Sequence, residues 1–258
     1  MSLRVLLIDA YNLIRRVYAA QDGEEDIQHL VNTIHSCSQS LQRALQQHKP
    51  SHAICIFKGH QATRRVKIYP QYKSGRSAVP EYLQQGLKDF QEVFQEIGIG
   101  SICIPEFECD DIIATLADKL TQKDGRVQIL STSQIYCQLL APGVFIHDHF
   151  RNQPINEQTV QDKFHVSPDQ LVDYWSLAGL STYQLQGVPG IGPKTAIKLL
   201  ETYGSLDKIL ASAEEIKGKP GKKLQEHREE ALLTREVVSL QKNLHLGINL
   251  KDFRCPPL

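Results

Sequence analysis

The segment Arg4-Val5-Leu6-Leu7-Ile8-Asp9 decides the fold of this chain. A short run of branched apolar residues is typical of a strand that is buried on both faces of a parallel sheet. Similar runs recur at residues 53–57, 101–104, 127–130 and 144–146. Segments of helical periodicity separate them, at residues 27–47, 82–97 and 110–120. This alternation predicts an α/β fold, in which helices cover both faces of a central, mostly parallel sheet.

The second part of the chain has the pattern of helices joined by turns. Strand patterns end near Phe150, and a glycine-rich turn then separates two helical segments. Ser167-Pro168 matches a helix start, while Gly204-Ser205 matches the end of one helix and the start of the next. We therefore predict an α/β domain over residues 1–150 and a helical region over residues 151–258.

Composition indicates a globular protein, and the balanced net charge does not indicate which ligand it binds. Of the 258 residues, 41% are hydrophobic, and 29 basic residues balance 29 acidic ones. No run reaches the roughly 18 apolar residues of a membrane span, so we expect no membrane contact and a cytoplasmic location. The six cysteines lack the spacing of a zinc site and are interpreted as small core residues.

Acidic side chains follow two of the predicted strands. Asp9 ends the first strand, where an open α/β sheet places functional groups, although an aspartate there can also simply cap the next helix. Glu108, Asp110 and Asp111 stand together after the third strand. Clustered carboxylates repel one another unless a cation shares them, and their oxygens suit Mg²⁺ or Mn²⁺. We therefore expect a metal site, the alternative being a helix start enriched in acids.

A basic segment lies between the two acidic positions. Residues 58–80 contain no acid, and Tyr69 and Tyr72 interleave with the cations. The cations of this segment are Lys58, Arg64, Arg65, Lys67, Lys73 and Arg76. Such a mixture suits a phosphate backbone with bases stacked on the rings. We expect the segment to face the same crevice as the acids, the alternative being a solvated surface loop.

The turn Gly187-Val188-Pro189-Gly190-Ile191-Gly192-Pro193-Lys194-Thr195 joins two predicted helices. It follows no strand, which argues against a dinucleotide fingerprint, and it lacks the spacing of a Walker A loop. Its glycines let the backbone approach a phosphate, and the second helix directs its first amides there. We expect a clamp for the DNA backbone, the alternative being a tight helical connection. The predicted DNA contacts are Gly190, Ile191, Gly192, Pro193, Lys194 and Thr195.

These three features, in this order, resemble the 5′-nuclease family of flap endonucleases. LLIDAYNLIRR is similar to the family's first metal-binding strand, and FECDDIIATLA is similar to its EADDxIxTLA motif. YPQYKSGR is similar to the arch motif YKxxRPPxP, and DYWSLAGLSTYQLQGVPGIGPKTA is similar to the helix-three-turn-helix. The likeness covers nearly the whole chain. It extends to the 5′-nuclease domain of bacterial DNA polymerase I and is greatest to the stand-alone enzymes of the exonuclease IX type.

The resemblance implies a PIN-like nuclease domain with a helical arch at residues 58–80 and a helix-three-turn-helix at residues 168–204. It implies 5′–3′ phosphodiester hydrolysis by a monomer that uses Mg²⁺ or Mn²⁺ and acts on 5′ flaps or branched DNA in replication and repair. The implied metal ligands are Asp9, Glu108, Asp110 and Asp111. The residues implied to bind DNA phosphate are Arg64, Arg65, Lys73 and Arg76, the last three of them stabilising charge during catalysis. Potassium would bind the main-chain carbonyls of Leu177, Ala178, Gln186, Val188 and Ile191.

Lys58 departs from the family pattern, which has an aspartate at this position. We expect its ammonium to pair with Asp9 and Asp110 and to cancel part of the negative charge that attracts Mg²⁺. Metal binding should then be weak and cleavage slow.

The family's second metal site is missing from the sequence. Residues 131–136 read STSQIY instead of STGDKD, and residues 179–184 read GLSTYQ instead of GDSSDN. The double proline of the arch is replaced at residues 77–78 by Ser-Ala. We predict a flap endonuclease with one carboxylate cluster. The alternatives are a DNA-junction binding protein with a degenerate site, and a small-molecule phosphohydrolase, which would leave the clamp unexplained.

Overall fold

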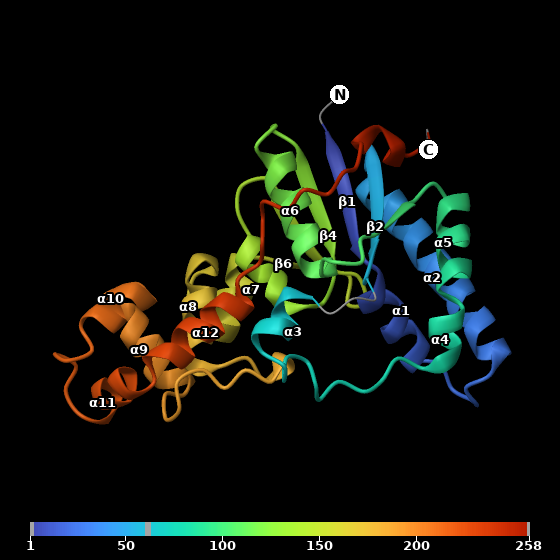
Figure 1. Cartoon of the computed structure of the whole chain (residues 1–258). Coiled ribbons are helices and arrows are strands. Elements are labelled where there is room, and N and C mark those ends of the chain that lie inside the picture. Colours follow the sequence, from blue (N-terminus) through green and yellow to red (C-terminus); the bar gives the residue numbers. More distant parts are fainter. Residues whose placement is uncertain (1–2, 60–62, 257–258) are drawn as a thin grey trace.

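A six-stranded sheet is the centre of the computed structural model, which describes residues 3–59 and 63–256 (Figure 1). The strand order is β3-β2-β1-β4-β5-β6, and every neighbouring pair is parallel except β5 and β6. The strands are β1 (Arg4–Asp9), β2 (His52–Phe57), β3 (Gly100–Cys103), β4 (Arg126–Leu130), β5 (Val144–Asp148) and β6 (Gln153–Ile155). The five predicted strands are confirmed. β6 is an addition beyond residue 150, too short and too polar to show a strand pattern.

Helices cover both faces of this sheet, as predicted. Leu6 and Ile8 of β1 pack in one core with α1, α2 and α5, whereas Val5 and Leu7 pack in a second core with α6. These helices are α1 (Ala10–Ala19), α2 (Ile27–His48), α5 (Leu87–Glu96) and α6 (Cys109–Thr121). The second core continues into the C-terminal helices, where Trp175 is fully buried. The α/β part and the helical part therefore share one core.

Residues 82–97 were predicted as one helix and instead form two. α4 (Glu81–Gln85) and α5 meet at Gly86. A side chain at Gly86 would come within 2.7 Å of Leu30 on α2, so the missing side chain allows the close approach of these helices. The apolar periodicity runs through Gly86 and gave no sign of the break.

The basic segment crosses the end of the sheet from α3 (Arg64–Ile68) to α4 (Figure 1). Residues 69–80 between these helices form turns and extended chain. Among the described residues of the predicted arch at 58–80, only α3 is helical, and α4 begins directly after the arch ends. Residues 60–62 of the arch lie outside the described part of the chain.

The helical part contains the turn predicted to clamp DNA. Its helices are α7 (Glu157–Phe164), α8 (Leu171–Ala178), α9 (Pro193–Tyr203), α10 (Leu206–Ala211), α11 (Lys219–Glu226) and α12 (Arg228–Val238). Gly204 ends α9 with a φ of 83°, and the Ser205 side chain caps α10, both as predicted. Across the described residues, no helix combines the length and the apolar character needed to cross a membrane.

Candidate active site

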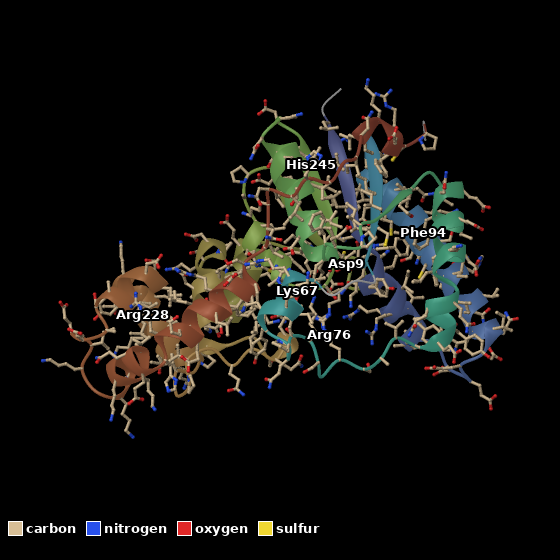
Figure 2. All side chains as sticks on the ribbon, in the orientation of Figure 1. Asp9, Lys67, Arg76, Phe94, Arg228 and His245 are labelled. Carbon is tan, nitrogen blue, oxygen red and sulfur yellow. The ribbon has the colours of Figure 1, made fainter. Side chains whose placement is uncertain are left out.

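The carboxyl ends of β1 and β4 form a crevice, because the strand order reverses between these two strands. An open cavity of about 790 Å³ lies at this end of the sheet. Three acids and five basic residues help to line it: Asp9, Glu108, Asp110, Arg15, Arg16, Lys58, Lys73 and Arg76. Figure 2 shows Asp9 at the end of the sheet and Arg76 on the segment that crosses it. The basic segment therefore faces the same crevice as the acids.

Asp9 both caps a helix and faces the cavity. Its Oδ1 accepts the backbone N–H of Asn12 at 3.2 Å, so the helix-capping alternative also holds for this residue. Its Oδ2 accepts the hydroxyl groups of Ser131 and Tyr136 at 3.1 and 3.2 Å. Burial, and then the charge of Asp110, raise the pKa of Asp9 to about 6. A cation close to Asp9 would therefore stabilise its ionised form.

Asp110 is the centre of the hydrogen-bond network. Its Oδ1 accepts the Tyr136 hydroxyl at 2.9 Å, and its Oδ2 accepts the Lys73 ammonium at 3.1 Å and the Tyr183 hydroxyl at 3.3 Å. Burial alone would raise the pKa of Asp110, but the charges of Lys73 and Arg65 outweigh burial and lower it to about 2. Tyr136 carries a single hydroxyl proton, so it can donate to Asp9 or to Asp110 but not to both at once.

Glu108 binds the same ammonium as Asp110. The Nζ atom of Lys73 lies 2.8 Å from Oε2 of Glu108, which also accepts the Tyr72 hydroxyl at 3.3 Å. The Thr63 hydroxyl donates to Oε1 at 2.6 Å. Asp9, Glu108 and Asp110 have six carboxylate oxygens in all, and each of these oxygens accepts a hydrogen bond from the protein.

Asp111 and Arg65 pair with each other instead of facing the cavity. The guanidinium of Arg65 contacts both oxygens of Asp111 at 2.5 and 2.8 Å, and both side chains are buried. The backbone N–H of Gln241 donates to Asp111 at 2.9 Å, and Arg65 donates to the carbonyls of Val237 and Ser239. Consecutive helical residues point about 100° apart, which separates Asp111 from Asp110. This geometry does not fit the predicted roles of Asp111 in metal binding and of Arg65 in phosphate binding.

Lys58 and Arg64 also differ from their predicted roles. Lys58 lines the cavity with an exposed side chain, but within the described residues its ammonium forms no ion pair with Asp9 or Asp110. Lys73 takes that place, because the turn after α3 directs its side chain between the carboxylates. Arg64 binds Glu236 of α12 at 2.7 Å, away from the cavity lining.

The carboxylates suit a divalent metal in kind but not in their present arrangement. Buried carboxylate oxygens are the ligands that Mg²⁺ and Mn²⁺ prefer. Within residues 3–59 and 63–256, however, no three Asp, Glu, His or Cys side chains converge closely enough to enclose a metal ion. The ammonium of Lys73 supplies positive charge to Glu108 and Asp110 instead.

Tyr136 and Tyr183 are site residues that the sequence did not reveal. They stand at two positions where the resembling family has aspartates of its second metal site. Their hydroxyl groups donate to Asp110, so these positions now bind the first carboxylate cluster. The sequence signal that could have identified them is the tyrosine that replaces an aspartate within each motif.

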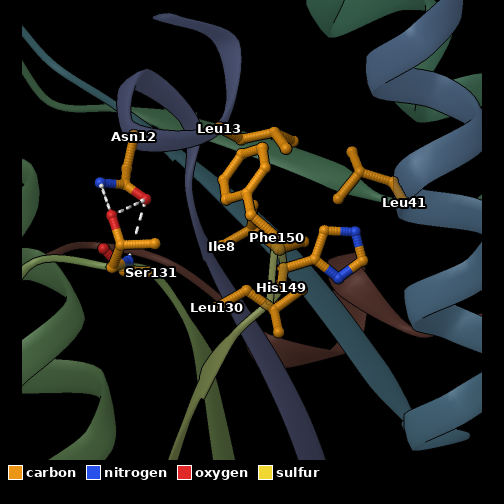
Figure 3. A pocket seen from close by; sticks show the side chains of 9 residues that line it. Ile8, Asn12, Leu13, Leu41, Leu130, Ser131, His149 and Phe150 are labelled. Atoms are coloured by element: carbon orange, nitrogen blue, oxygen red, sulfur yellow. Dashed lines mark hydrogen bonds between the residues drawn. The ribbon is translucent and has the colours of Figure 1, made fainter. Parts of the chain in front are cut away.

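A polar contact ties α1 to the loop after β4 beside the cavity (Figure 3). The side chain of Asn12 and the backbone and hydroxyl of Thr132 exchange hydrogen bonds of 3.0 Å. Arg16 also donates to the Thr132 hydroxyl at 3.2 Å, and its guanidinium lies 5.0 Å from the centre of the Phe150 ring. The small cavity next to these residues has a volume of about 10 Å³, the lower limit for one water molecule. It is too small for a ligand.

The glycine-rich turn exposes the start of α9. Gly192, Pro193 and Lys194 are exposed, and a side chain built at Gly192 would meet no atom within 4 Å. Gly190 has a φ of 84° and lies against Lys223 of α11. Ile191 is 3% exposed and its backbone N–H donates to the Val188 carbonyl at 2.9 Å, and its contact with DNA stays a prediction.

The carbonyls predicted to bind potassium lie around a close backbone contact. A side chain at Gly187 would come within 2.5 Å of the Leu177 carbonyl oxygen, and one at Gly179 within 2.7 Å of the Gln186 oxygen. The carbonyls of Leu177 and Val188 accept backbone hydrogen bonds of 2.9 Å. Potassium binding at this turn remains a prediction.

Known families match both parts of the chain. The N-terminal resolvase-like domain of 5′-3′ exonucleases matches residues 4–165, and their C-terminal SAM fold matches residues 166–258. Flap endonuclease Xni of Photobacterium profundum is 43% identical over 256 residues, which are 98% of each chain. Flap endonuclease Xni of Aliivibrio fischeri is 40% identical and covers 98% of this chain and 97% of its own. The chain belongs to the Xni flap endonuclease family.

Membership of the Xni family confirms the resemblance that the motifs predicted. The fold is also that of the bacteriophage T5 flap endonuclease in a complex with DNA and metal ions. That chain is 18% identical, with a TM-score of 0.74, and the match covers 91% of this chain and 88% of the other. The α/β nuclease domain with a C-terminal helical fold is thereby confirmed.

Proposed function

We propose that the protein hydrolyses a phosphodiester at the junction between a 5′ single-stranded flap and duplex DNA, with the help of a divalent metal ion. The observation that carries this proposal is the cavity at the end of the sheet, which is lined by three carboxylates and five cations. The Xni relatives are named flap endonucleases, and the T5 enzyme forms a complex with DNA and metal ions. Both support the same substrate and the same kind of cofactor for this chain.

Asp9, Glu108 and Asp110 would hold Mg²⁺ or Mn²⁺, directly or through water. The chemistry that a metal would supply at these residues is polarisation of the phosphate and activation of a water. Lys73 and Arg76 would bind the phosphate oxygens and offset the charge that grows on them during the reaction. Arg15 and Arg16 line the same cavity and would attract the backbone of the single strand.

Lys58 would lower the affinity of this site for metal and slow cleavage. Its ammonium adds a positive charge to the cavity at a position where the family has a carboxylate. Because its side chain is exposed and lies outside the ion pairs of Asp110, solvent screens this charge and the effect should be modest.

The exposed start of α9 would hold the duplex arm of the substrate. Its first amides and Lys194 suit a phosphate, and Lys223 of α11 lies beside Gly190 of the same turn. Potassium at the neighbouring carbonyls would add positive charge. We expect the protein to act as a monomer, with the cavity and the turn of one chain binding one substrate.

A second candidate function is binding of DNA junctions without efficient cleavage. It is favoured by the contacts of Lys73, which already occupies Glu108 and Asp110.

Separate measurements of binding and cleavage distinguish the two functions. Labelled 5′-flap DNA, with a 3′ flap and a linear duplex as controls, is incubated with the protein in Mg²⁺ or in EDTA. Cleavage is followed on gels, and binding is followed by fluorescence anisotropy in EDTA. We expect cleavage of the 5′ flap in Mg²⁺ only, close to the junction. Tight flap binding without cleavage in either Mg²⁺ or Mn²⁺ would establish the second function instead.

A further inference from the structure

Several contacts hold Lys73 within the carboxylate cluster, while one side of its side chain lines the open cavity. Its Nζ atom lies 2.8 Å from Glu108 and 3.1 Å from Asp110, and its side chain is 17% exposed. The rings of Tyr72 and Tyr183 flank the ammonium, each with its centre 4.7 Å away. The backbone N–H of Lys73 donates to the carbonyl of Tyr183 at 3.3 Å. The candidate metal site therefore contains a positive charge of the protein itself.

A divalent ion and this ammonium need the same oxygens. Lys73 occupies Oε2 of Glu108 and Oδ2 of Asp110, the two carboxylates that Asp9 would need as partners in a metal site. An ammonium this close also cancels about one unit of the negative charge that attracts a metal ion, and screening is weak at a buried pair. A metal ion must therefore compete with the Lys73 ammonium for Glu108 and Asp110.

We propose that Lys73 is a resident counter-ion that leaves Glu108 and Asp110 when the divalent ion binds, and that a DNA phosphate provides its alternative partner. This inference rests on the proposed function and describes how metal and DNA bind at its site. Metal and DNA then bind cooperatively, because each favours the state in which Lys73 has left the carboxylates. Linkage requires the effect to be mutual, so that DNA tightens metal binding as much as metal tightens DNA binding.

The backbone around Lys73 allows this exchange. Lys73 has a φ of 57°, a left-handed backbone conformation that residues other than glycine rarely adopt. It belongs to residues 69–80, which form no helix or strand. Arg76 of the same segment lines the cavity, where it would bind the same phosphate. A phosphate bound beside Arg76 would replace the ion pairs that Lys73 loses.

Metal titration of charge variants tests the proposal without relying on cleavage. Lys73→Met removes the ammonium, and Lys67→Met is the matched control, because it removes the same charge from an exposed position on α3. Mn²⁺ affinity is measured by electron paramagnetic resonance, with and without saturating 5′-flap DNA. For wild type and Lys67→Met, we expect weak Mn²⁺ binding that DNA strengthens. For Lys73→Met, Mn²⁺ should bind the DNA-free protein on the order of tenfold more tightly, with little further gain from DNA.

Lys73→Gln provides a second variant, which keeps a hydrogen-bond donor but no charge. The same tightening in Lys73→Gln shows that the charge competes with the metal, and thermal melting verifies that both variants are folded. Unchanged or weaker Mn²⁺ binding by both Lys73 variants without DNA would overturn the proposal. That result leaves flap cleavage by the wild type as a separate question, since the proposed function fails only if the wild type does not cleave.

Discussion

Asp110 and Asp111 are neighbours in the first turn of α6, and each meets a cation of the basic segment, yet their two ion pairs have different surroundings. The Asp111–Arg65 pair is sealed, with side chains 5% and 2% exposed and further bonds to the backbone of residues 237–241. The Asp110–Lys73 pair lines the cavity, with side chains 11% and 17% exposed. The buried Asp111–Arg65 pair stabilises the fold. The Asp110–Lys73 pair faces a cavity, so either residue can exchange its partner for a ligand.

Asp110→Asn should have the largest effect, and the effect should fall on activity. The variant loses a carboxylate charge that the metal needs, and metal ions contribute several kcal/mol to catalysis, so flap cleavage should fall on the order of a thousandfold or more. Single-turnover cleavage in Mg²⁺ measures this, while anisotropy in EDTA should show flap binding that is retained. Cleavage at the wild-type rate would remove Asp110 from the metal site.

Asp111→Asn should instead destabilise the fold. The change leaves Arg65 buried without its charge partner, and breaking a buried pair typically costs about 3 to 5 kcal/mol. Urea unfolding measures the loss, which should exceed that of Asp110→Asn.

The double variant Arg65→Met with Asp111→Leu is the control for that role. Replacing both charges by apolar groups should recover much of the stability, together with cleavage. A stable but inactive Asp111→Asn protein would contradict the structural role and return Asp111 to the metal site.

Asp9→Asn should stabilise the metal-free protein at high pH. The pKa of Asp9 is raised to about 6, so its ionisation in the folded state costs stability as the pH rises from about 4 through 6. At pH 8 in EDTA the variant should gain roughly 3 kcal/mol over the wild type, and the gain should vanish near pH 4. Urea unfolding at several pH values measures it, with the exposed Asp22→Asn as the control. A constant difference across this range would exclude titration of Asp9 as the cause.

Gly192→Val should have the smallest effect, confined to DNA binding. Gly192 is exposed, its φ of −91° suits any residue, and a side chain there meets no neighbour, so the fold should tolerate the change within about 0.5 kcal/mol. A valine would keep the backbone from a phosphate, and flap binding should weaken about tenfold by anisotropy. Gly190→Ala is a poorer test, because the φ of 84° at that position would strain the fold as well. Unchanged affinity in the Gly192 variant would show that the turn is not the clamp.

The sequence predicted the sheet and the place of the site because both depend on local patterns. Apolar runs such as residues 4–9 and 53–57 define buried strands, and the acid after β1 necessarily reaches the carboxyl edge of the sheet. The resemblance of the motifs then gave the family. Gly86, by contrast, leaves room for Leu30 of another helix, a contact that the sequence of its own segment does not show.

The partners of charged side chains could not be predicted in the same way. Six cations of the basic segment look alike in sequence, but the backbone conformation at Lys73 and the rotation between Asp110 and Asp111 decide which cation meets which acid. The sequence points to Lys58 because of the residue it replaces, whereas Lys73 forms the ion pair because of the turn that carries it.

The position of a bound metal tests the central claim most directly. Anomalous diffraction at the manganese edge, from crystals of the protein grown with Mn²⁺ and 5′-flap DNA, locates the ion without reference to rates. We expect a peak among Asp9, Glu108 and Asp110, with Lys73 moved onto a phosphate and the Asp111–Arg65 pair unchanged. A peak at Asp111, or a cleaving complex with no metal at these three carboxylates, would contradict the account.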